Sequence, residues 1–164
     1  MPTLTSPKAR VQLDPARTAL LLAGQYSLWE PLVEYDPTSR YYTRLAKQPG
    51  FDAWLLTWLP GQGTDWHDHG GSAGTFITVR GTLTERHAVI TQDGPPTVQP
   101  GTRSVSPGDL RTFGRRHLHR VTNEDGVPAV SLHVYTPGLT EMRRYVDENG
   151  RLRQVSAEAA GVDW

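Results

Sequence analysis

The sequence contains no cysteine in its 164 residues, and this absence removes several kinds of chemistry. Disulfide bonds, a thiolate nucleophile and the zinc or iron–sulfur sites that need sulfur ligands are all excluded. A metal bound by this chain must therefore use histidine or carboxylate ligands.

The chain also lacks an excess of charge and a long apolar run. Lys plus Arg number 17 and Asp plus Glu number 17, so no broad electrostatic field favours nucleic acid or a membrane surface. The longest apolar run, residues 19–23, is far shorter than the ~20 residues that cross a bilayer, and no signal-peptide pattern opens the chain. We expect a soluble, unprocessed cytoplasmic protein, a monomer or weak homo-oligomer, that binds neither nucleic acid nor membranes.

The N-terminal part has the signals of a helical cap. After a loose lead-in of about 14 residues, Asp14 can cap a helix and Pro15 suits its first turn. The apolar residues 19–22 and Leu28 should form its buried stripe, and Pro31 should end or kink it. A second, shorter helix is expected over residues 37–47.

From residue 51 onward, short runs of β-branched and aromatic residues alternate with turn sequences. The expected strands are 51–59, 75–79, 82–91, 97–105, 109–113, 117–122 and 127–135, followed by a hairpin of 142–146 and 152–155 around Asn149-Gly150. With 16 Gly and 13 Pro, the chain should be mainly β, a barrel or sandwich with a short N-terminal helical cap. We expect a single domain 1–164, with lead-in and cap at 1–50, barrel at 51–137, and hairpin and tail at 138–164.

The segment His67-Asp68-His69 carries the strongest chemical signal. On a strand, residues two apart face the same side, so both imidazoles would point inward and Asp68 outward. Two imidazoles directed at one point favour a metal site, although ordinary interior or surface histidines are the alternative reading.

Gly61, followed by five residues and then by His-x-His, with Gly81 further on, resembles the first motif of the cupin superfamily. That motif normally carries a Glu after its second His, and Ala73 or Gly74 stands at the corresponding place. The carboxylate ligand of the motif is therefore missing.

His119, followed by Asn123, is similar to the second cupin motif, which supplies the last metal ligand from a neighbouring strand. His117 lies two residues earlier and is the competitor for that place; we favour His119. Three neutral ligands leave the charge of a divalent ion uncompensated, which favours an anion such as hydroxide or thiolate at the open positions. These ligands suit Fe(II), but they also suit zinc.

Residues 40–137 resemble one cupin family, the bacterial type of the cysteine dioxygenase (type I) family of thiol dioxygenases. The motifs that carry the resemblance are Tyr41-Tyr42-Thr43-Arg44, Trp58, His67-Asp68-His69, His119-Arg120-Val121 and Ser131-Leu132-His133-Val134-Tyr135. The resemblance implies a cupin-type β-barrel (jelly-roll) in which His67, His69 and His119 bind Fe(II).

The resemblance also implies substrate-binding roles. Arg44 would pair with the substrate carboxylate through its planar guanidinium, although a surface Arg is the ordinary alternative. Tyr42 would add a hydroxyl there, and Trp58 would form a pocket wall.

Ser131, His133 and Tyr135 alternate along one expected strand and would share a face. In the family, this array places the tyrosine hydroxyl beside substrate and oxygen, so the resemblance implies a catalytic role. A polar stack that satisfies its own hydrogen bonds is the alternative.

Mammalian members carry a cysteine that is crosslinked to the active-site tyrosine, and Gly74 stands at that place, so Tyr135 should be an unmodified phenol. The resemblance implies oxidation of L-cysteine with O2 to cysteine sulfinic acid. Relatives that act on 3-mercaptopropionate tend to have Gln at the place of Arg44, which favours cysteine. Another small thiol, or a non-catalytic or zinc-binding cupin, remains the alternative. His87 is expected to face solvent.

Overall fold

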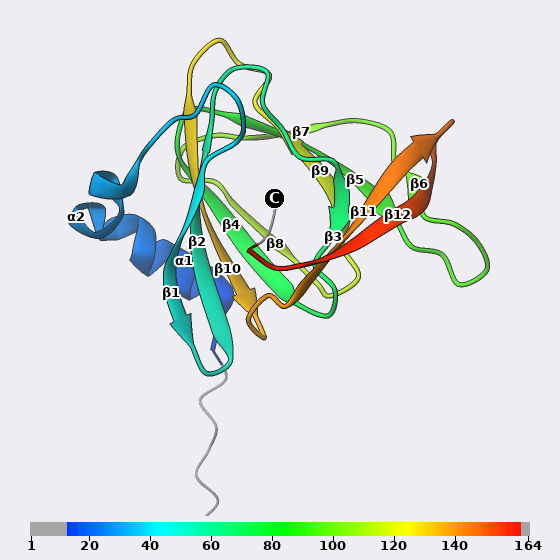
Figure 1. Ribbon diagram of the computed structural model, residues 1–164, viewed down its shortest axis with the longest axis horizontal. Helices are drawn as coiled ribbons and strands as arrows, with labels where there is room; N and C mark the ends of the chain where they lie inside the picture. The colour runs from blue at the N-terminus through cyan, green and yellow to red at the C-terminus, as the bar shows by residue number, and fades with distance from the viewer. Residues whose placement is uncertain (1–12, 162–164) are drawn as a thin grey trace, which may run out of the picture.

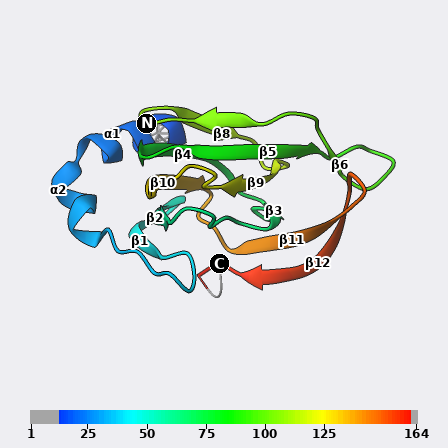
Figure 2. The ribbon, with the colours of Figure 1, turned by 90° about the horizontal axis from the view of Figure 1, so that it is seen from above.

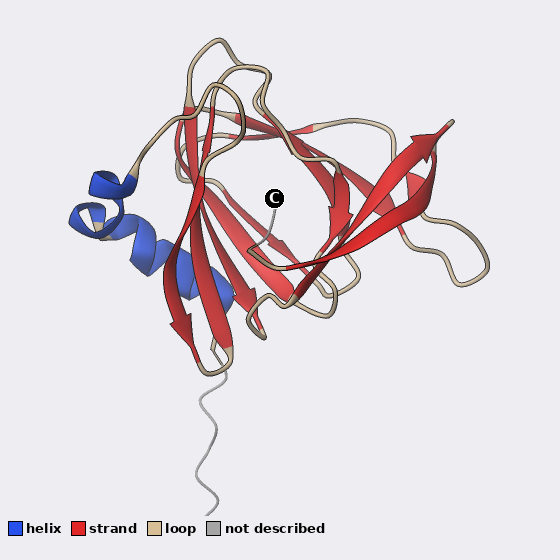
Figure 3. Cartoon of the chain, in the orientation of Figure 1, coloured by secondary structure: helices blue, strands red, loops and turns tan. Residues whose placement is uncertain are grey.

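The computed structural model describes residues 13–161, and the expected lead-in lies almost entirely outside this part (Figure 1). Two antiparallel sheets face each other as a barrel, with the helices packed on one outer side (Figures 1 and 3). This arrangement confirms the expectation of a mainly β barrel with a short N-terminal helical cap.

One sheet has five strands, in the order β1-β2-β10-β4-β8. Its strands are β1 (Tyr42–Gln48), β2 (Phe51–Trp58), β4 (Ala73–Arg80), β8 (Leu110–Phe113) and β10 (Ala129–Thr136). The other sheet has seven strands, in the order β6-β12-β11-β3-β9-β5-β7. Its strands are β3 (Trp66–Asp68), β5 (Leu83–Val89), β6 (Thr97–Val98), β7 (Arg103–Val105), β9 (Leu118–Thr122), β11 (Glu141–Glu148) and β12 (Arg151–Ala159). Figure 2 shows the two layers from above.

Alternation along β2 divides the apolar core into two parts. Trp54, Leu56 and Trp58 point into the barrel, whereas Ala53 and Leu55 pack on the outer face of the sheet. Strand residues two apart share a face, so a run of consecutive buried residues serves both layers.

The helical cap covers that outer face. Helix α1 (Pro15–Gly24) begins as predicted, because the Asp14 carboxylate accepts hydrogen bonds from the backbone N–H groups of Ala16 at 3.0 Å and Arg17 at 3.3 Å. A short α2 (Tyr26–Trp29) and a 3-10 turn (Glu30–Leu32) follow.

The expected apolar stripe of the cap is wrong in three places. Ala19 is buried against the sheet, but Leu20, Leu21 and Leu28 are 50%, 58% and 43% exposed. Consecutive residues of a helix point to different sides, so Leu20 and Leu21 turn away from the sheet that buries Ala19. Leu28 lies beyond the end of α1 at Gly24 and does not continue its stripe.

The helix expected over residues 37–47 is also wrong. Most of this segment is the edge strand β1, which pairs antiparallel with β2 across the turn at Pro49-Gly50. Pairing with β2 overrides the local helical signal. The strand expected over 97–105 is divided into β6 and β7, because the chain turns at Gly101, whose φ is +90°.

The C-terminal hairpin forms around the predicted dipeptide, with φ of 58° at Asn149 and 86° at Gly150, as a two-residue hairpin turn requires. It is longer than expected and is part of the barrel, because β11 pairs with β3. None of the described helices is long and apolar enough to cross a membrane.

Candidate metal centre

Three buried histidines from the seven-stranded sheet converge inside the barrel. His67 on β3 stands directly opposite His119 on β9, so the two side chains share a face of the sheet. His69 follows β3 and lies on the same side, with its ring centroid 5.0 Å from that of His67 and 5.1 Å from that of His119. One nitrogen of each ring lies within 4.8 Å of the others, so this group could hold a metal ion.

Hydrogen bonds fix the orientation of two of these rings, and each bond uses only one of the two nitrogens of its ring. The Nδ1 of His67 donates to the carbonyl oxygen of Asp65 at 2.9 Å, and the Nδ1 of His119 bonds the Glu85 carboxylate at 2.7 Å. Because each Nδ1 carries the proton, the Nε2 lone pair of each ring is available to a metal.

His69 lacks any such partner. Its side chain is 1% exposed, and neither ring nitrogen has a hydrogen-bond partner among the described residues. A buried polar nitrogen without a partner is costly, and a metal ion bound to one nitrogen would remove part of that cost. The donor set therefore fits a metal.

The imidazoles are neutral near pH 7. Burial, reinforced by neighbouring histidines, lowers the pKa of His67 and of His69 well below 6.5. Burial also lowers the pKa of His119, to about 4, although the Glu85 carboxylate opposes the shift. Neutral imidazole is the form that binds a metal.

A polar chain along β10 lies inside the same barrel. The Oγ of Ser131 is 2.8 Å from Nε2 of His133, and the hydroxyl of Tyr135 is 3.3 Å from its Nδ1. The indole N–H of Trp58 donates to Ser131 at 2.9 Å. If Ser131 donates to His133 and His133 donates to Tyr135, each of these donors has an acceptor, and the hydroxyl hydrogen of Tyr135 is left for another group.

This row of hydrogen-bonded side chains is uncharged and lies close to the histidine group. Burial raises the pKa of Tyr135 above its usual value, and burial lowers that of His133. The rings of Tyr135 and His69 are 5.1 Å apart between centroids. A protonated phenol next to the candidate metal site is suited to donating a hydrogen bond.

A cavity of about 130 Å³ opens beside the histidine group. Arg40, Met142 and Arg144 line it together with residues 63–65 and His67. Arg40 is 9% exposed, and its Nε has no partner among the described residues. Burial lowers the pKa of Arg40 to about 10, so the guanidinium still carries its charge near pH 7. A buried cation with an unused donor is suited to an anionic ligand.

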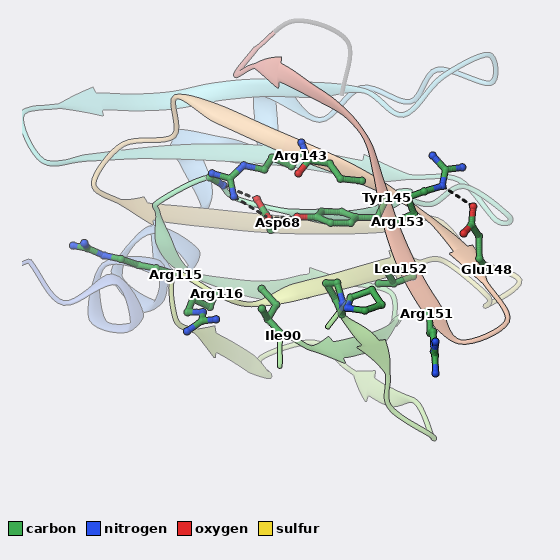
Figure 4. A pocket seen from close by; sticks show the side chains of 14 residues that line it. Asp68, Ile90, Arg115, Arg116, Arg143, Tyr145, Glu148, Arg151, Leu152 and Arg153 are labelled. Carbon is green, nitrogen blue, oxygen red and sulfur yellow. Dashed lines mark hydrogen bonds and ion pairs between the residues drawn. The ribbon is translucent and has the colours of Figure 1, made fainter. Parts of the chain in front are cut away.

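A larger groove of about 810 Å³ lies on the other side of β3 (Figure 4). Asp68 belongs to its wall, and its carboxylate accepts a hydrogen bond from the Tyr145 hydroxyl at 2.6 Å and lies 3.6 Å from Arg143. None of the three histidines lines this groove. The smaller cavity, which His67 does line, is therefore the candidate active site.

The comparisons with known proteins agree with this geometry. A sequence profile of the family cysteine dioxygenase type I matches residues 17–148. The chain belongs to the cysteine dioxygenase type I family. No curated protein matches it significantly.

Solved structures show the same fold as this cysteine dioxygenase family member. The TT1209 protein of Thermus thermophilus is 23% identical, with a TM-score of 0.56 over 66% of this chain and 93% of that one. A cupin superfamily protein of Desulfitobacterium hafniense is 11% identical, with a TM-score of 0.53 over 66% of this chain and 87% of that one. These likenesses confirm the cupin barrel expected from the sequence.

The substrate-binding residues named from the cysteine dioxygenase motif lie in different surroundings. Trp58 is fully buried beside Ser131. Tyr42 is partly buried and packs against the inner core. Arg44 is exposed on the edge strand β1, with its guanidinium carbon 4.4 Å from the centre of the Trp54 ring, and it does not line the cavity beside His67.

Gly74, at the place of the crosslinked cysteine of mammalian cysteine dioxygenases, pairs directly with Tyr135 across β4 and β10. A Cβ on residue 74 would lie 2.8 Å from the Phe113 ring and 2.9 Å from Cδ1 of Tyr135. The packing at this position therefore requires glycine.

Two residues of the site were not named from the sequence. Arg40 precedes Tyr42 by two positions, so the alternation of an extended segment was an available signal. The sequence gives no comparable signal for Glu85, because the alternation of side chains along a strand does not predict which other strand pairs with it. His117, the competitor for the third ligand position, is not in the group with His67 and His69 and instead bonds Glu85 at 3.0 Å. His87, expected to face solvent, is half-buried.

Proposed function

We propose that this protein is a thiol dioxygenase that oxidises L-cysteine with O2 to cysteine sulfinic acid, with mononuclear non-haem Fe(II) held by His67, His69 and His119. The observation that carries the proposal is the group of three neutral imidazoles beside a cavity that also contains a buried guanidinium. Membership in the cysteine dioxygenase type I family supports the same chemistry.

Iron bound at this site would supply adjacent positions for a thiolate and dioxygen and the redox chemistry that joins them. Three uncharged ligands favour the binding of an anionic thiolate, because none of them offsets the charge of the metal. The role of the chain is to hold the ligands, orient the substrate and exclude competing groups from the site.

We propose Arg40 as the partner of the substrate carboxylate. Its burial, its unused Nε and its place in the wall that it shares with His67 support this role. The sequence motif predicts this role for Arg44 instead. The exposure of Arg44 and its contact with Trp54 favour a supporting role on β1.

We propose that Tyr135 donates a hydrogen bond to the substrate or to oxygen. The hydrogen bonds support this role: Trp58 donates to Ser131, and if Ser131 then donates to His133 and His133 to Tyr135, the phenol hydrogen is left for substrate or oxygen. The phenol stays protonated, because burial raises its pKa.

Metal analysis followed by oxygen consumption tests the proposal. The purified protein, loaded with Fe(II), should consume O2 with L-cysteine and form cysteine sulfinic acid. Faster turnover of 3-mercaptopropionate would assign a different thiol substrate. No oxygen uptake with either thiol would favour a non-catalytic or zinc-binding cupin.

Matched histidine variants make the test specific to the site. His69→Ala should abolish both metal retention and oxygen uptake. His87→Gln should retain both, because His87 is outside the group formed by His67, His69 and His119. Equal losses in the two variants would contradict the assignment.

A further inference from the structure

Glu85 is a buried carboxylate next to one of the three candidate ligands. Its side chain is 1% exposed, on β5, within the barrel. Three basic side chains from other segments surround it: Nδ1 of His119 at 2.7 Å, Nε2 of His117 at 3.0 Å, and the guanidinium of Arg111. A buried carboxylate is tolerated only when it is paired and hydrogen-bonded in this way.

The two oxygens of the carboxylate have different partners. The guanidinium of Arg111, which is always charged, pairs with Oε2, and the two imidazoles of His117 and His119 face Oε1. An acceptor-only carboxylate requires Nδ1 of His119 to be the donor. The Nε2 atom of His119 is thereby left without a proton.

The first cupin motif of this chain lacks its acidic ligand, so the three histidines offer the metal no negative charge. Glu85 is a fixed negative charge one hydrogen bond away from the group. A carboxylate bonded to a ligand imidazole orients the ring and makes it a stronger donor.

We propose that Glu85 is the positioning residue of the metal centre, which fixes His119 with Nε2 toward the metal and makes its imidazole a stronger donor. This inference rests on the proposed function, since it requires a metal at His67, His69 and His119.

A second reading would make Glu85 itself a ligand. Glu85, His117 and His119 also have ligand atoms within 4.8 Å of one another. In that group, however, Nδ1 of His119 and Nε2 of His117 both already bond the carboxylate, and Arg111 pairs with its other oxygen. A cation there would displace these bonds and lie next to the guanidinium, so we favour the hydrogen-bonded arrangement.

The test measures metal affinity rather than turnover. Dissociation constants for Co(II) are determined by competition with a chelator, together with the visible spectrum of the bound Co(II). Glu85→Gln keeps an acceptor for His119 but removes the charge. We expect its affinity to fall by about 10- to 100-fold, with a shifted Co(II) spectrum. Glu85→Ala, which also frees the His119 ring, should fall further.

Arg111→Gln is the matched control, because it breaks the same ion pair and leaves the carboxylate in place. If Glu85 merely anchors Arg111, both variants lose affinity equally. If Glu85 serves the metal, Arg111→Gln retains or increases the affinity for Co(II), because removal of the guanidinium leaves the negative charge of Glu85 less compensated.

The double variant Glu85→Gln with Arg111→Met avoids a buried unpaired charge if Glu85→Gln alone does not fold. Its affinity should fall as in the single glutamine variant, and an unchanged affinity would overturn the inference. One metal ion per wild-type chain is expected. Two ions per chain would overturn the inference alone, whereas no binding by the wild-type protein would overturn the proposed function with it.

Discussion

The guanidinium carbon of Arg40 lies 4.8 Å from the centre of the Trp58 ring, whose indole N–H donates to Ser131. One buried tryptophan thus contacts both the cation proposed to bind substrate and the row of hydrogen-bonded side chains that leads to Tyr135. The face of Trp58 is occupied by Arg40, so the position of the guanidinium is fixed by packing as well as by charge.

Arg40→Gln tests the proposed partner of the carboxylate. A hydrogen bond to a charged group contributes about 1.5–3 kcal/mol, so KM for L-cysteine should rise by about tenfold or more, with the iron content unchanged. Arg44→Gln is the matched control and should change KM little, because Arg44 is exposed and does not line the cavity beside His67. A larger effect in the Arg44 variant would restore the prediction from the motif.

Sequence patterns predicted most of this architecture, but not the contacts between distant strands. The Asp14 cap, the hairpin at Asn149-Gly150 and the His-x-His segment follow from local rules of spacing and turn geometry. The helix predicted over residues 37–47 is wrong because pairing with strand β2, and not local propensity, decides the conformation of this segment. Glu85 could not be foreseen, because its role depends on the register of β5 against β9.

Tyr135→Phe removes the proposed hydrogen-bond donor and little else. Positioned proton donors contribute about 10²-fold or more, so kcat should fall by about that factor, while iron content and thermal stability stay close to wild type. Tyr41→Phe is the control, since Tyr41 packs in the outer core beneath the helices. Full activity of the Tyr135 variant would leave the β10 chain with a structural role only.

Gly74→Ala should destabilise the fold and displace Tyr135. The added Cβ would lie 2.8 Å from the Phe113 ring, and overpacking of this kind costs about 1–3 kcal/mol in the free energy of unfolding. Urea denaturation measures the loss. Gly71→Ala, at a position with no atom within 4 Å of the added Cβ, should be close to neutral. Equal midpoints for the two variants would contradict the packing argument.

The metal-free protein should lose stability on acidification. Burial lowers the pKa of His67, His69 and His133 well below the unfolded value of 6.5, and lowers that of His119 to about 4. Below pH 6.5 the unfolded chain binds protons that the folded chain does not, so the free energy of unfolding falls as the pH drops from 6.5 toward these lower values. Urea midpoints measured with the metal removed should decrease across this window. A midpoint that stays constant or increases would show that these imidazoles are not buried in neutral form.

The strand that carries His67 has one neighbour, β9, from the middle of the chain and another, β11, from near its end. All of His67, His69 and His119 have been synthesised before Arg143–Tyr145 arrive to pair with β3. A nascent chain that stops after β10 therefore carries every candidate ligand while one edge of β3 is still unpaired. The cavity beside His67, which Met142 and Arg144 of β11 also line, is therefore completed only when the C-terminal hairpin has paired with β3.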